Sequence, residues 1–479
     1  MPPVPPSRDA ASRVHFRRAV TLLLMTLLLP GTAQLVAGNR RVGRFALRVW
    51  LTCAGTLAVV VLLGLAWHGV VYYLLSSTVV LGFLRLVLCV LAVGWAGLFL
   101  DAWRLGQPLE LRQKQRLAMV GLNGVLCFAV AGSLLFASHV VAVQRGFITA
   151  MFGDGKATAA HQGRYNVLLL GGDSGKDRWG LRPDSLTVAS IDAETGRTVL
   201  FGLPRNMTSF PVAKGSVMAE QVPGGYDCDT CELNSLATWA GDHKSLFKGY
   251  ADPGVEATVE GVEGITGLPI NYYAMVNLQG FRSMVQALGG LKLNVRDRIP
   301  IGGVGGPVTG YIEPGVQRLN GFETLWFARS RESADDYSRM ARQKCVMNAM
   351  LQQLSPTTVV TKFESIAKAS EKLVTTDLPA SELGRFAELA LKARSQPVST
   401  VSFVPPAINT GDPDIPTIQS MVRRALDKAE GKAVAKPAAT RKKARKGFSA
   451  GRQSTVGGSI GNLHDGYAAN ESTDLSSSC

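Results

Sequence analysis

Carboxylates and arginines recur at the ends of short apolar runs between residues 165 and 206. Asp173 follows a run that ends at Leu170, Arg182 and Asp184 open the next run, and Arg205 closes a third. If these runs are strands of one sheet, their ends can bring the four side chains to one edge. Two carboxylates can then hold Mg²⁺ while guanidinium groups clamp phosphate oxygens. From spacing alone, ordinary surface ion pairs between loops are an open alternative.

A second group of cations lies between residues 327 and 343, where Arg329 and Arg331 precede Arg339, Arg342 and Gln343. The last three are spaced to share one face near the start of a predicted helix over residues 338–354. Cations at a helix N-terminus oppose its dipole, so they are better tolerated where an anion binds between them. A solvated basic face is the alternative here.

The glycine-rich segment GGDSGKDR does not form a nucleotide-binding P-loop. That motif requires G-x-x-x-x-G-K-[ST], whereas Leu170 stands in the first glycine position and Asp177 follows Lys176. None of the six histidines falls in a motif. A carboxylate is therefore the expected general base. Asp173 is the candidate, and binding of a metal ion is the competing role for this residue.

Hydrophobic patterning predicts the elements that would position these residues. Strands are expected at 165–170, 185–191, 198–203, 272–276 and 291–295, and helices at 255–268, 278–288 and 338–354. Strands mixed with helices of this length indicate an α/β sandwich.

Four apolar stretches fill the first 145 residues, at about 19–37, 49–72, 79–100 and 118–143. The last three are long enough to span a bilayer. Pro30-Gly31 interrupts the first, and arginines flank it on both sides, so the positive-inside rule places both flanks in the cytoplasm. We therefore expect three spanning helices plus one re-entrant or interfacial segment. The protein is then a multi-pass cell-membrane protein whose remaining domain is exoplasmic.

The composition fits this division. The 479 residues carry a net charge of +15, with 46% hydrophobic and 18% charged residues, a balance that suggests a membrane part joined to a soluble part. We expect a membrane region over 1–145, a linker over 146–163, a catalytic domain over 164–408, a helical extension over 409–430, and a basic, Gly/Ser-rich disordered tail over 431–479. An exoplasmic tail excludes nucleic acid as a partner and favours anionic envelope material.

Cys228 and Cys231 form a C-x-x-C pair, and the sequence contains no second such pair to complete a zinc site. In an oxidising compartment they are expected to form a local disulfide.

Four segments in order are similar to the LytR-CpsA-Psr family: NVLLLGGD, RPDSLTVASIDAETGRTVLFGLPRN, INYYAMVNLQGFRSMVQALGGLKLNV and LNGFETLWFARSRESADDYSRMARQ. The resemblance covers about residues 164–355. It implies an α/β/α domain with a mixed central sheet behind N-terminal membrane helices. It also implies transfer of a phosphate-linked glycopolymer, such as teichoic acid, capsule or arabinogalactan, from a polyprenyl-pyrophosphate carrier to peptidoglycan.

The resemblance also assigns roles. Asp173 and Asp184 match metal-associated aspartates, implying Mg²⁺ or Mn²⁺, and with Arg205 they form the expected catalytic set. The expected pyrophosphate-binding residues are Arg182, Arg205, Arg329, Arg331, Arg339, Arg342 and Gln343. The sequence departs from the family pattern at two places. The family often has an arginine shortly after its first aspartate, where this chain has Gly175-Lys176, and it has an aspartate where this chain has Asn206.

Two other functions use the same residues. A lipid-pyrophosphate hydrolase would have water as its acceptor. A non-catalytic envelope-binding or regulatory protein would need only the basic surfaces.

Overall fold

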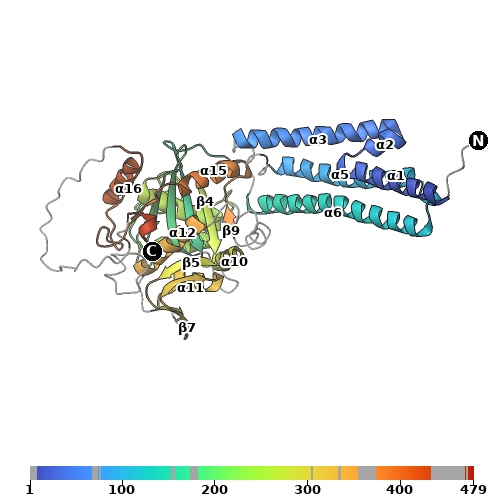
Figure 1. The fold of residues 1–479 in the computed structure, drawn as a ribbon. Coiled ribbons are helices and arrows are strands. Elements are labelled where there is room, and N and C mark those ends of the chain that lie inside the picture. The colour runs from blue at the N-terminus through green and yellow to red at the C-terminus, as the bar shows by residue number, and fades with distance from the viewer. Residues whose placement is uncertain are drawn as a thin grey trace, which may run out of the picture. The chain divides into compact units, whose positions relative to one another are not determined.

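The computed structural model describes residues 8–66, 74, 77–152, 157–172, 182–303, 306–332, 336–353, 374–432, 470 and 473–478. The chain divides into two compact units, Met1–Thr149 and Ala150–Cys479 (Figure 1).

The first unit is helical. It contains α1 (Arg8–Leu28), α2 (Thr32–Ala37), α3 (Arg40–Ala66), α5 (Thr78–Leu105), the short 3₁₀ turn η1 (Pro108–Glu110) and α6 (Gln113–Met151). Among the described residues, three helices are long and apolar enough to cross a membrane: Arg40–Ala66, Thr78–Leu105 and Gln113–Thr149. Helix α6 continues past residue 145, where the sequence analysis ends the membrane region.

The first apolar stretch is broken at the position that the sequence indicates. Gly31 has a φ of +96°, and a Cβ there would lie 2.5 Å from the carbonyl oxygen of Gly43. On either side of this break, α1 and α2 pack against α5. Trp95 Nε1 donates to the Thr26 carbonyl at 3.0 Å, and Gln34 Nε2 donates to the Leu98 carbonyl at 3.1 Å.

A mixed six-stranded sheet forms the centre of the second unit. Its strands are β1 (Arg164–Gly172), β2 (Pro183–Asp192), β3 (Thr198–Leu203), β4 (Tyr272–Asn277), β9 (Val374–Thr376) and β10 (Ser399–Ser402), in the order β10-β3-β2-β1-β4-β9. Strands β1, β2 and β3 are antiparallel, whereas β4 runs parallel to β1 and β10 parallel to β3. The predicted mixed α/β fold is confirmed.

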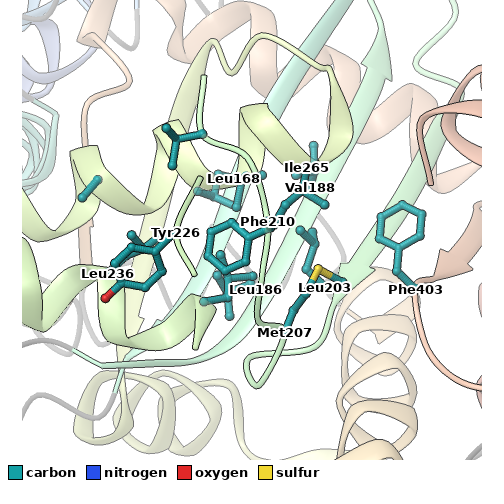
Figure 2. Close-up of a cluster of buried hydrophobic side chains, with 14 of the residues drawn as sticks. Leu168, Leu186, Val188, Leu203, Met207, Phe210, Tyr226, Leu236, Ile265 and Phe403 are labelled. Carbon is teal, nitrogen blue, oxygen red and sulfur yellow. The ribbon is translucent and has the colours of Figure 1, made fainter. Parts of the chain in front are cut away.

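Side chains alternate between the two faces of this sheet. Val199 and Phe201 enter one core, which α8 (Leu236–Asp242), α9 (Pro253–Thr266) and α16 (Ile415–Ala429) cover. Figure 2 shows part of this core, including Leu186, Val188 and Leu203. Leu200, between Val199 and Phe201, points to the other face, where Met347 of α12 (Asp336–Gln353) packs. Helix α15 (Leu383–Arg394) also packs against the sheet, through Leu389. Successive side chains of a strand point to opposite faces, so a sheet that is buried on both faces needs apolar residues at consecutive positions.

Two small two-stranded sheets and two helices complete the second unit. They are α10 (Leu278–Leu288), β5 (Leu291–Val295), β6 (Ile299–Gly302), β7 (Val308–Ile312), β8 (Gly315–Leu319) and α11 (Gly321–Arg329), with β5 paired to β8 and β6 to β7. Asn320 starts α11 with a capping box that includes Glu323. Their core also receives Cys345 and Val346 of α12.

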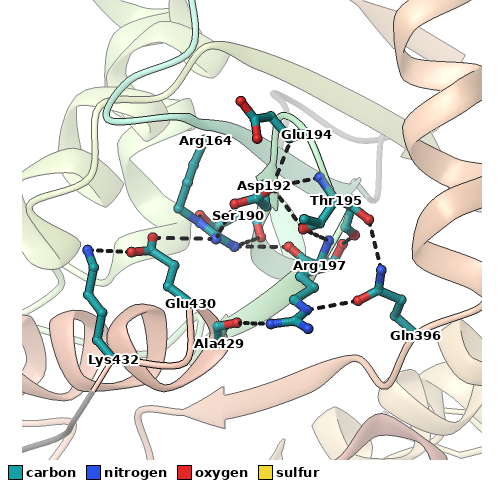
Figure 3. A network of polar contacts seen from close by, with 12 residues as sticks. Arg164, Ser190, Asp192, Glu194, Thr195, Arg197, Gln396, Ala429, Glu430 and Lys432 are labelled. Atoms are coloured by element: carbon teal, nitrogen blue, oxygen red, sulfur yellow. Dashed lines mark hydrogen bonds and ion pairs between the residues drawn. The ribbon is translucent and has the colours of Figure 1, made fainter.

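A polar network closes one end of the β1–β2 hairpin (Figure 3). The Arg164 side chain is only 4% exposed, and its Nη1 lies 3.7 Å from both Asp192 Oδ2 and Glu430 Oε1. Its other nitrogens donate to the Ser190 hydroxyl at 2.9 Å and to the carbonyls of Ser190 and Arg197 at 2.8 and 3.1 Å. Burial lowers the pKa of Arg164, while Asp192 and Glu430 oppose that shift. The network ties the end of α16 to the sheet.

The prediction of a disordered tail over 431–479 is wrong for the end of the chain. Asn470 and Leu475 are buried, and residues Thr473–Leu475 pair with β10. The last residues lie near α12 (Figure 1). Composition missed this contact because it depends on one apolar side chain and backbone pairing rather than on periodicity.

Candidate functional site

A cavity of about 840 Å³ opens where β1 and β4 end, where β2 begins, and where α10, α11 and α12 meet these strands. Its volume is within the range of ligand sites, about 300–1,000 Å³. Gly171 and Asp184 contribute from the β1–β2 pair, and Asn277 contributes from the end of β4. The antiparallel register pairs Leu186 of β2 with Leu203 of β3, so the start of β2 lies beside the end of β3. Asp184 and Arg205 therefore meet.

One part of the cavity is strongly cationic. Five arginines line it, together with two carboxylates and two amides: Arg182, Arg205, Arg329, Arg331, Arg339, Asp184, Glu232, Asn234 and Gln343. The structure thus brings together residues that lie more than 150 positions apart in sequence, as the sequence analysis predicts for all of these arginines.

Asp336, the first residue of α12, holds three of these arginines. Its carboxylate lies 2.9 Å from Arg205 Nε, 3.3 Å from Arg339 Nη1 and 3.6 Å from Arg331 Nη1. Arg205 also bonds the Asp184 carboxylate. Sequence reasoning missed Asp336. Its position at a helix start, three residues before Arg339, is the signal that could have found it.

The titration behaviour of this cluster follows from burial and from the opposing charges. Burial raises the pKa of Asp336, but Arg339, Arg205 and Arg331 outweigh it, and the pKa lies below its usual value. Burial lowers the pKa of Arg205, but Asp336 and Asp184 outweigh it, and the pKa lies above its usual value. For Arg339 burial dominates and lowers the pKa to about 10. All three groups remain charged at neutral pH.

Among the described residues, the charges of this cluster do not balance. Five arginines line the cavity against the carboxylates of Asp184 and Glu232, with Asp336 behind them. Arg339 is 3% exposed. Buried charges are stable only when paired, so a surplus of guanidinium groups favours an anionic ligand. The geometry suits a group with several oxygens, such as a phosphate or pyrophosphate.

The disulfide loop contributes to the same edge. Cys228 and Cys231 are joined by a disulfide. Directly after it, Glu232 lies 4.0 Å from Arg182 Nη2, and Asn234 Oδ1 accepts from that atom at 3.4 Å. The backbone N–H of Asn234 donates to the Arg205 carbonyl at 3.0 Å. A loop closed by this bond thus orients Arg182. Glu232 and Asn234 were not singled out from sequence, although they directly follow the C-x-x-C pair.

The remaining lining of the cavity is apolar. It comes mainly from α10, α11 and α12 and includes Phe281, Met284, Leu325, Trp326, Val346, Met347 and Met350. Arg329 lies over the Trp326 ring, with 5.0 Å from its Cζ to the ring centroid, and so marks the border between the two parts. The cavity is amphipathic, with a cationic part and an apolar part.

The LytR_cpsA_psr family model matches residues 149–411, which is more than half of the chain. The chain belongs to this family. The matched region contains every described cavity residue named above.

The chain is similar to several characterised relatives. It is 26% identical over 237 residues to biofilm regulatory protein A of Streptococcus mutans, covering 48% of this chain and 53% of that protein. It is 23% identical over 279 residues to polyisoprenyl-teichoic acid--peptidoglycan teichoic acid transferase TagU of Bacillus subtilis, covering 56% and 80%. For TagV of Bacillus subtilis the identity is 25% over 225 residues, covering 46% and 51%. The chain thus spans about half the length of the first and third relatives.

Two solved structures are also similar. Bacillus subtilis TagV aligns with a TM-score of 0.41 at 23% identity, covering 57% of this chain and 99% of that one. Protein gbs0355 of Streptococcus agalactiae aligns with a TM-score of 0.42 at 20% identity, covering 57% and 90%.

The structure corrects one predicted site residue of this LytR-CpsA-Psr chain. Arg342 does not line the cavity: it is fully buried and donates to the Ser330 carbonyl at the end of α11. Arg342 lies about 60° around the helix axis from Arg339, and on this side the end of α11 packs against α12 and accepts its hydrogen bond. This hydrogen bond links α12 to the end of α11.

Of the two aspartates predicted to bind a metal ion, the structure describes only Asp184. Asp173 lies outside the described residues, although it directly follows Gly172, which pairs with Pro183. No group of three or more His, Cys, Asp or Glu that could hold a metal occurs in the described part of the chain. Mg²⁺ commonly binds through one or two carboxylates plus substrate phosphates. Asp184, partly exposed at the cavity, fits one such ligand, whereas Asp336 is already held by three arginines.

Proposed function

We propose that this protein transfers a phosphate-linked glycopolymer from a polyprenyl-pyrophosphate carrier to peptidoglycan, forming a phosphodiester link and releasing polyprenyl phosphate. The amphipathic cavity carries this proposal. Its cationic part suits the pyrophosphate, and its apolar part suits the polyprenyl chain. The relatives TagU and TagV are named as polyisoprenyl-teichoic acid--peptidoglycan teichoic acid transferases, which points to the same class of reaction.

The chemistry is a displacement at phosphorus. A peptidoglycan hydroxyl attacks the phosphorus next to the glycopolymer, the bond to the bridging oxygen breaks, and polyprenyl phosphate leaves with the electron pair. The hydroxyl proton passes to a carboxylate, with Asp173 as the candidate. Arg205, Arg331 and Arg339 stabilise the negative charge that develops on the phosphate oxygens. Asp336 orients these three guanidinium groups, so that little reorganisation is needed during the reaction.

We also propose that Asp173 and Asp184 hold Mg²⁺ or Mn²⁺ against the pyrophosphate. Such an ion supplies Lewis-acid stabilisation of the phosphate oxygens. Arg205 contacts Asp184, so Asp184 would hold the ion close to this guanidinium group.

The proposed location is the cell membrane, with three or more passes and the catalytic domain exoplasmic. The arginines around the first apolar stretch and in the loop before α6 support this orientation. Protease added to intact spheroplasts should then remove the domain. Cleavage only after lysis would show the opposite orientation.

A transfer assay tests the function. Full-length protein in nanodiscs would receive a synthetic polyprenyl-pyrophosphate glycan and peptidoglycan oligomers over a range of Mg²⁺ concentrations. We expect a glycan–peptidoglycan conjugate, and a loss of apparent Mg²⁺ affinity of about tenfold or more in Asp184→Asn. Asp229→Asn is the matched control, because Asp229 is exposed and does not line the cavity.

The products separate the alternatives. Release of free glycan phosphate without conjugate would identify a hydrolase. Unchanged transfer by well-folded Asp184→Asn protein would overturn the metal assignment. Tight substrate binding with no product at all would leave an envelope-binding or regulatory protein.

A further inference from the structure

Arg329 differs from the other arginines of the cavity in the group that holds it. Each of the others pairs with a carboxylate: Arg182 with Glu232, and Arg205, Arg331 and Arg339 with Asp336. In the described part of the chain, no carboxylate pairs with Arg329. The indole ring of Trp326 holds it instead, with 5.0 Å between Arg329 Cζ and the ring centroid.

An aromatic ring can hold a guanidinium group without neutralising it. The attraction comes from the negative face of the ring, which carries no net charge. The N–H groups of arginine lie in the plane of the guanidinium group and point outward from its edge, so they can still donate to phosphate oxygens. A carboxylate would occupy some of these donors. Trp326 can therefore fix the place of Arg329 and leave its charge and its donors to a ligand.

Trp326 is held in turn by an aromatic neighbour. Phe322, one turn earlier in α11, meets it edge to face, with 6.3 Å between the ring centroids and 68° between the ring planes. Arg282 of α10 lies over the Phe322 ring, with its Cζ 5.3 Å from the centroid. Residues 322, 326 and 329 are four and three positions apart, so they share one face of α11. These contacts keep the Trp326 ring in place at the cavity wall.

Trp326 stands where the two parts of the cavity meet. Leu325 beside it and Phe281 of α10 belong to the apolar part, whereas Arg331, two residues after Arg329, belongs to the cationic part. An indole ring has a large apolar surface and a face that attracts cations, so one ring can border both parts. A ligand that fills both parts has an apolar chain joined directly to a phosphate, and this junction lies at Trp326.

We propose, on the basis of the transfer function proposed above, that Trp326 is a positioning and specificity-determining residue for the lipid end of the donor. Its ring packs against the first isoprene units and holds Arg329 at the phosphate that carries them. Packing of the lipid against the ring restricts its motion and so orders Arg329. That phosphate leaves with the lipid, so Arg329 stabilises the charge of the leaving group. Inorganic pyrophosphate has no lipid and gains nothing from Trp326.

Binding of two small ligands tests this role without any transfer step. Full-length protein in nanodiscs would be titrated calorimetrically with geranyl pyrophosphate and, separately, with inorganic pyrophosphate. We expect the wild type to bind geranyl pyrophosphate at least tenfold more tightly. Trp326→Leu keeps an apolar side chain but removes the ring, so this preference should fall at least fivefold. Trp326→Phe should retain most of the preference, because a ring can still face Arg329.

A double-mutant cycle separates positioning from simple apolar contact. If Trp326 acts through Arg329, the loss of geranyl pyrophosphate affinity in Trp326→Leu with Arg329→Gln should be at least threefold smaller than the product of the single losses. Phe281→Leu is the matched control. Phe281 also lines the apolar part, but Arg329 lies over the ring of Trp326. The losses of Phe281→Leu and Arg329→Gln should therefore multiply.

Arg329→Gln alone provides a second test that does not depend on folding of a tryptophan variant. It should weaken geranyl pyrophosphate binding more than inorganic pyrophosphate binding, and equal losses would overturn the inference. Single losses of Trp326→Leu and Arg329→Gln that multiply would also overturn it and would leave the transfer function standing. Equal affinity of the wild type for the two ligands would overturn both this role and the proposed lipid donor.

Discussion

The two ends of the β1–β2 hairpin both carry buried arginines, but in different electrostatic settings. At the Arg164 end, one guanidinium faces two carboxylates and donates to three further oxygens. At the Asp184 end, the described part of the chain lines a cavity with five arginines and fewer carboxylates. The strands between these ends are nine and ten residues long, roughly 30 Å. Charge that is compensated within the protein indicates a structural network, whereas uncompensated charge at a cavity indicates a ligand site.

Replacement at the structural end should have the largest effect. Arg164→Leu leaves Asp192, Glu430 and two carbonyls without their donor, so we expect the free energy of unfolding to fall by about 3–5 kcal/mol. Transfer per folded molecule should not change, because the side chain lies at the opposite end of the hairpin. Chemical denaturation and a transfer assay on the folded fraction would measure the two. A stable but inactive variant would break the comparison.

Replacement of an arginine at the cavity end should lower transfer and leave stability nearly unchanged. Arg205→Lys should reduce transfer by about 2–4 kcal/mol of transition-state stabilisation, because one ammonium cannot contact Asp184, Asp336 and a phosphate together. Unfolding should change little. Arg197→Lys is a matched control, since Arg197 precedes β3 as Arg205 follows it, and it is exposed within the structural network. Equal transfer by the two variants would contradict the assignment of Arg205.

Asp336→Asn sharpens the comparison by increasing the charge surplus. Three arginines lose their shared carboxylate, so we expect the free energy of unfolding to fall by about 1–3 kcal/mol. An anion can replace the missing charge. Inorganic pyrophosphate should therefore raise the Tm of Asp336→Asn more than that of the wild type. Equal shifts in thermal scans would show that pyrophosphate does not take the place of the Asp336 carboxylate.

Glu256 lies among other carboxylates, so this part of the domain has a surplus of negative charge. Replacing Glu256 should have the smallest effect of the four changes. Burial, followed by Glu260, Glu263 and Asp377, raises the pKa of Glu256 to about 7 from an ordinary 4.5. Between these values the unfolded chain loses its proton while the folded chain keeps it, so stability falls as pH rises from about 4.5 to 7. Glu256→Gln should flatten this slope by about 1 kcal/mol or less, because solvent screens the partly exposed group.

The control for that measurement is Glu220→Gln, at an exposed position of the helix α7 (Val217–Gln221). It should leave the dependence of Tm on pH unchanged between pH 4.5 and 7. A slope that survives in Glu256→Gln would assign the effect to the other carboxylates.

The elements with strong local patterns were predictable from sequence. The prediction for 198–203 matches β3, and that for 278–288 matches α10. Alternating apolar residues place β3 between two packed faces, and the glycines that follow Leu288 end α10 with positive φ. Arginines at the ends of these elements were therefore also predictable as a group.

Only the tertiary structure decided which charges meet. Asp336 is one of two adjacent aspartates, and the sequence does not show which of them Arg205 reaches. Arg342 shares its residue type and region with Arg339, yet it is buried against the end of α11, where it donates to the Ser330 carbonyl. Strands β9 and β10 are too short to show a period, and they exist because neighbouring strands supply their hydrogen bonds. Sequence determines periodicity and residue type locally, whereas pairing between distant residues depends on the register and packing of the whole domain.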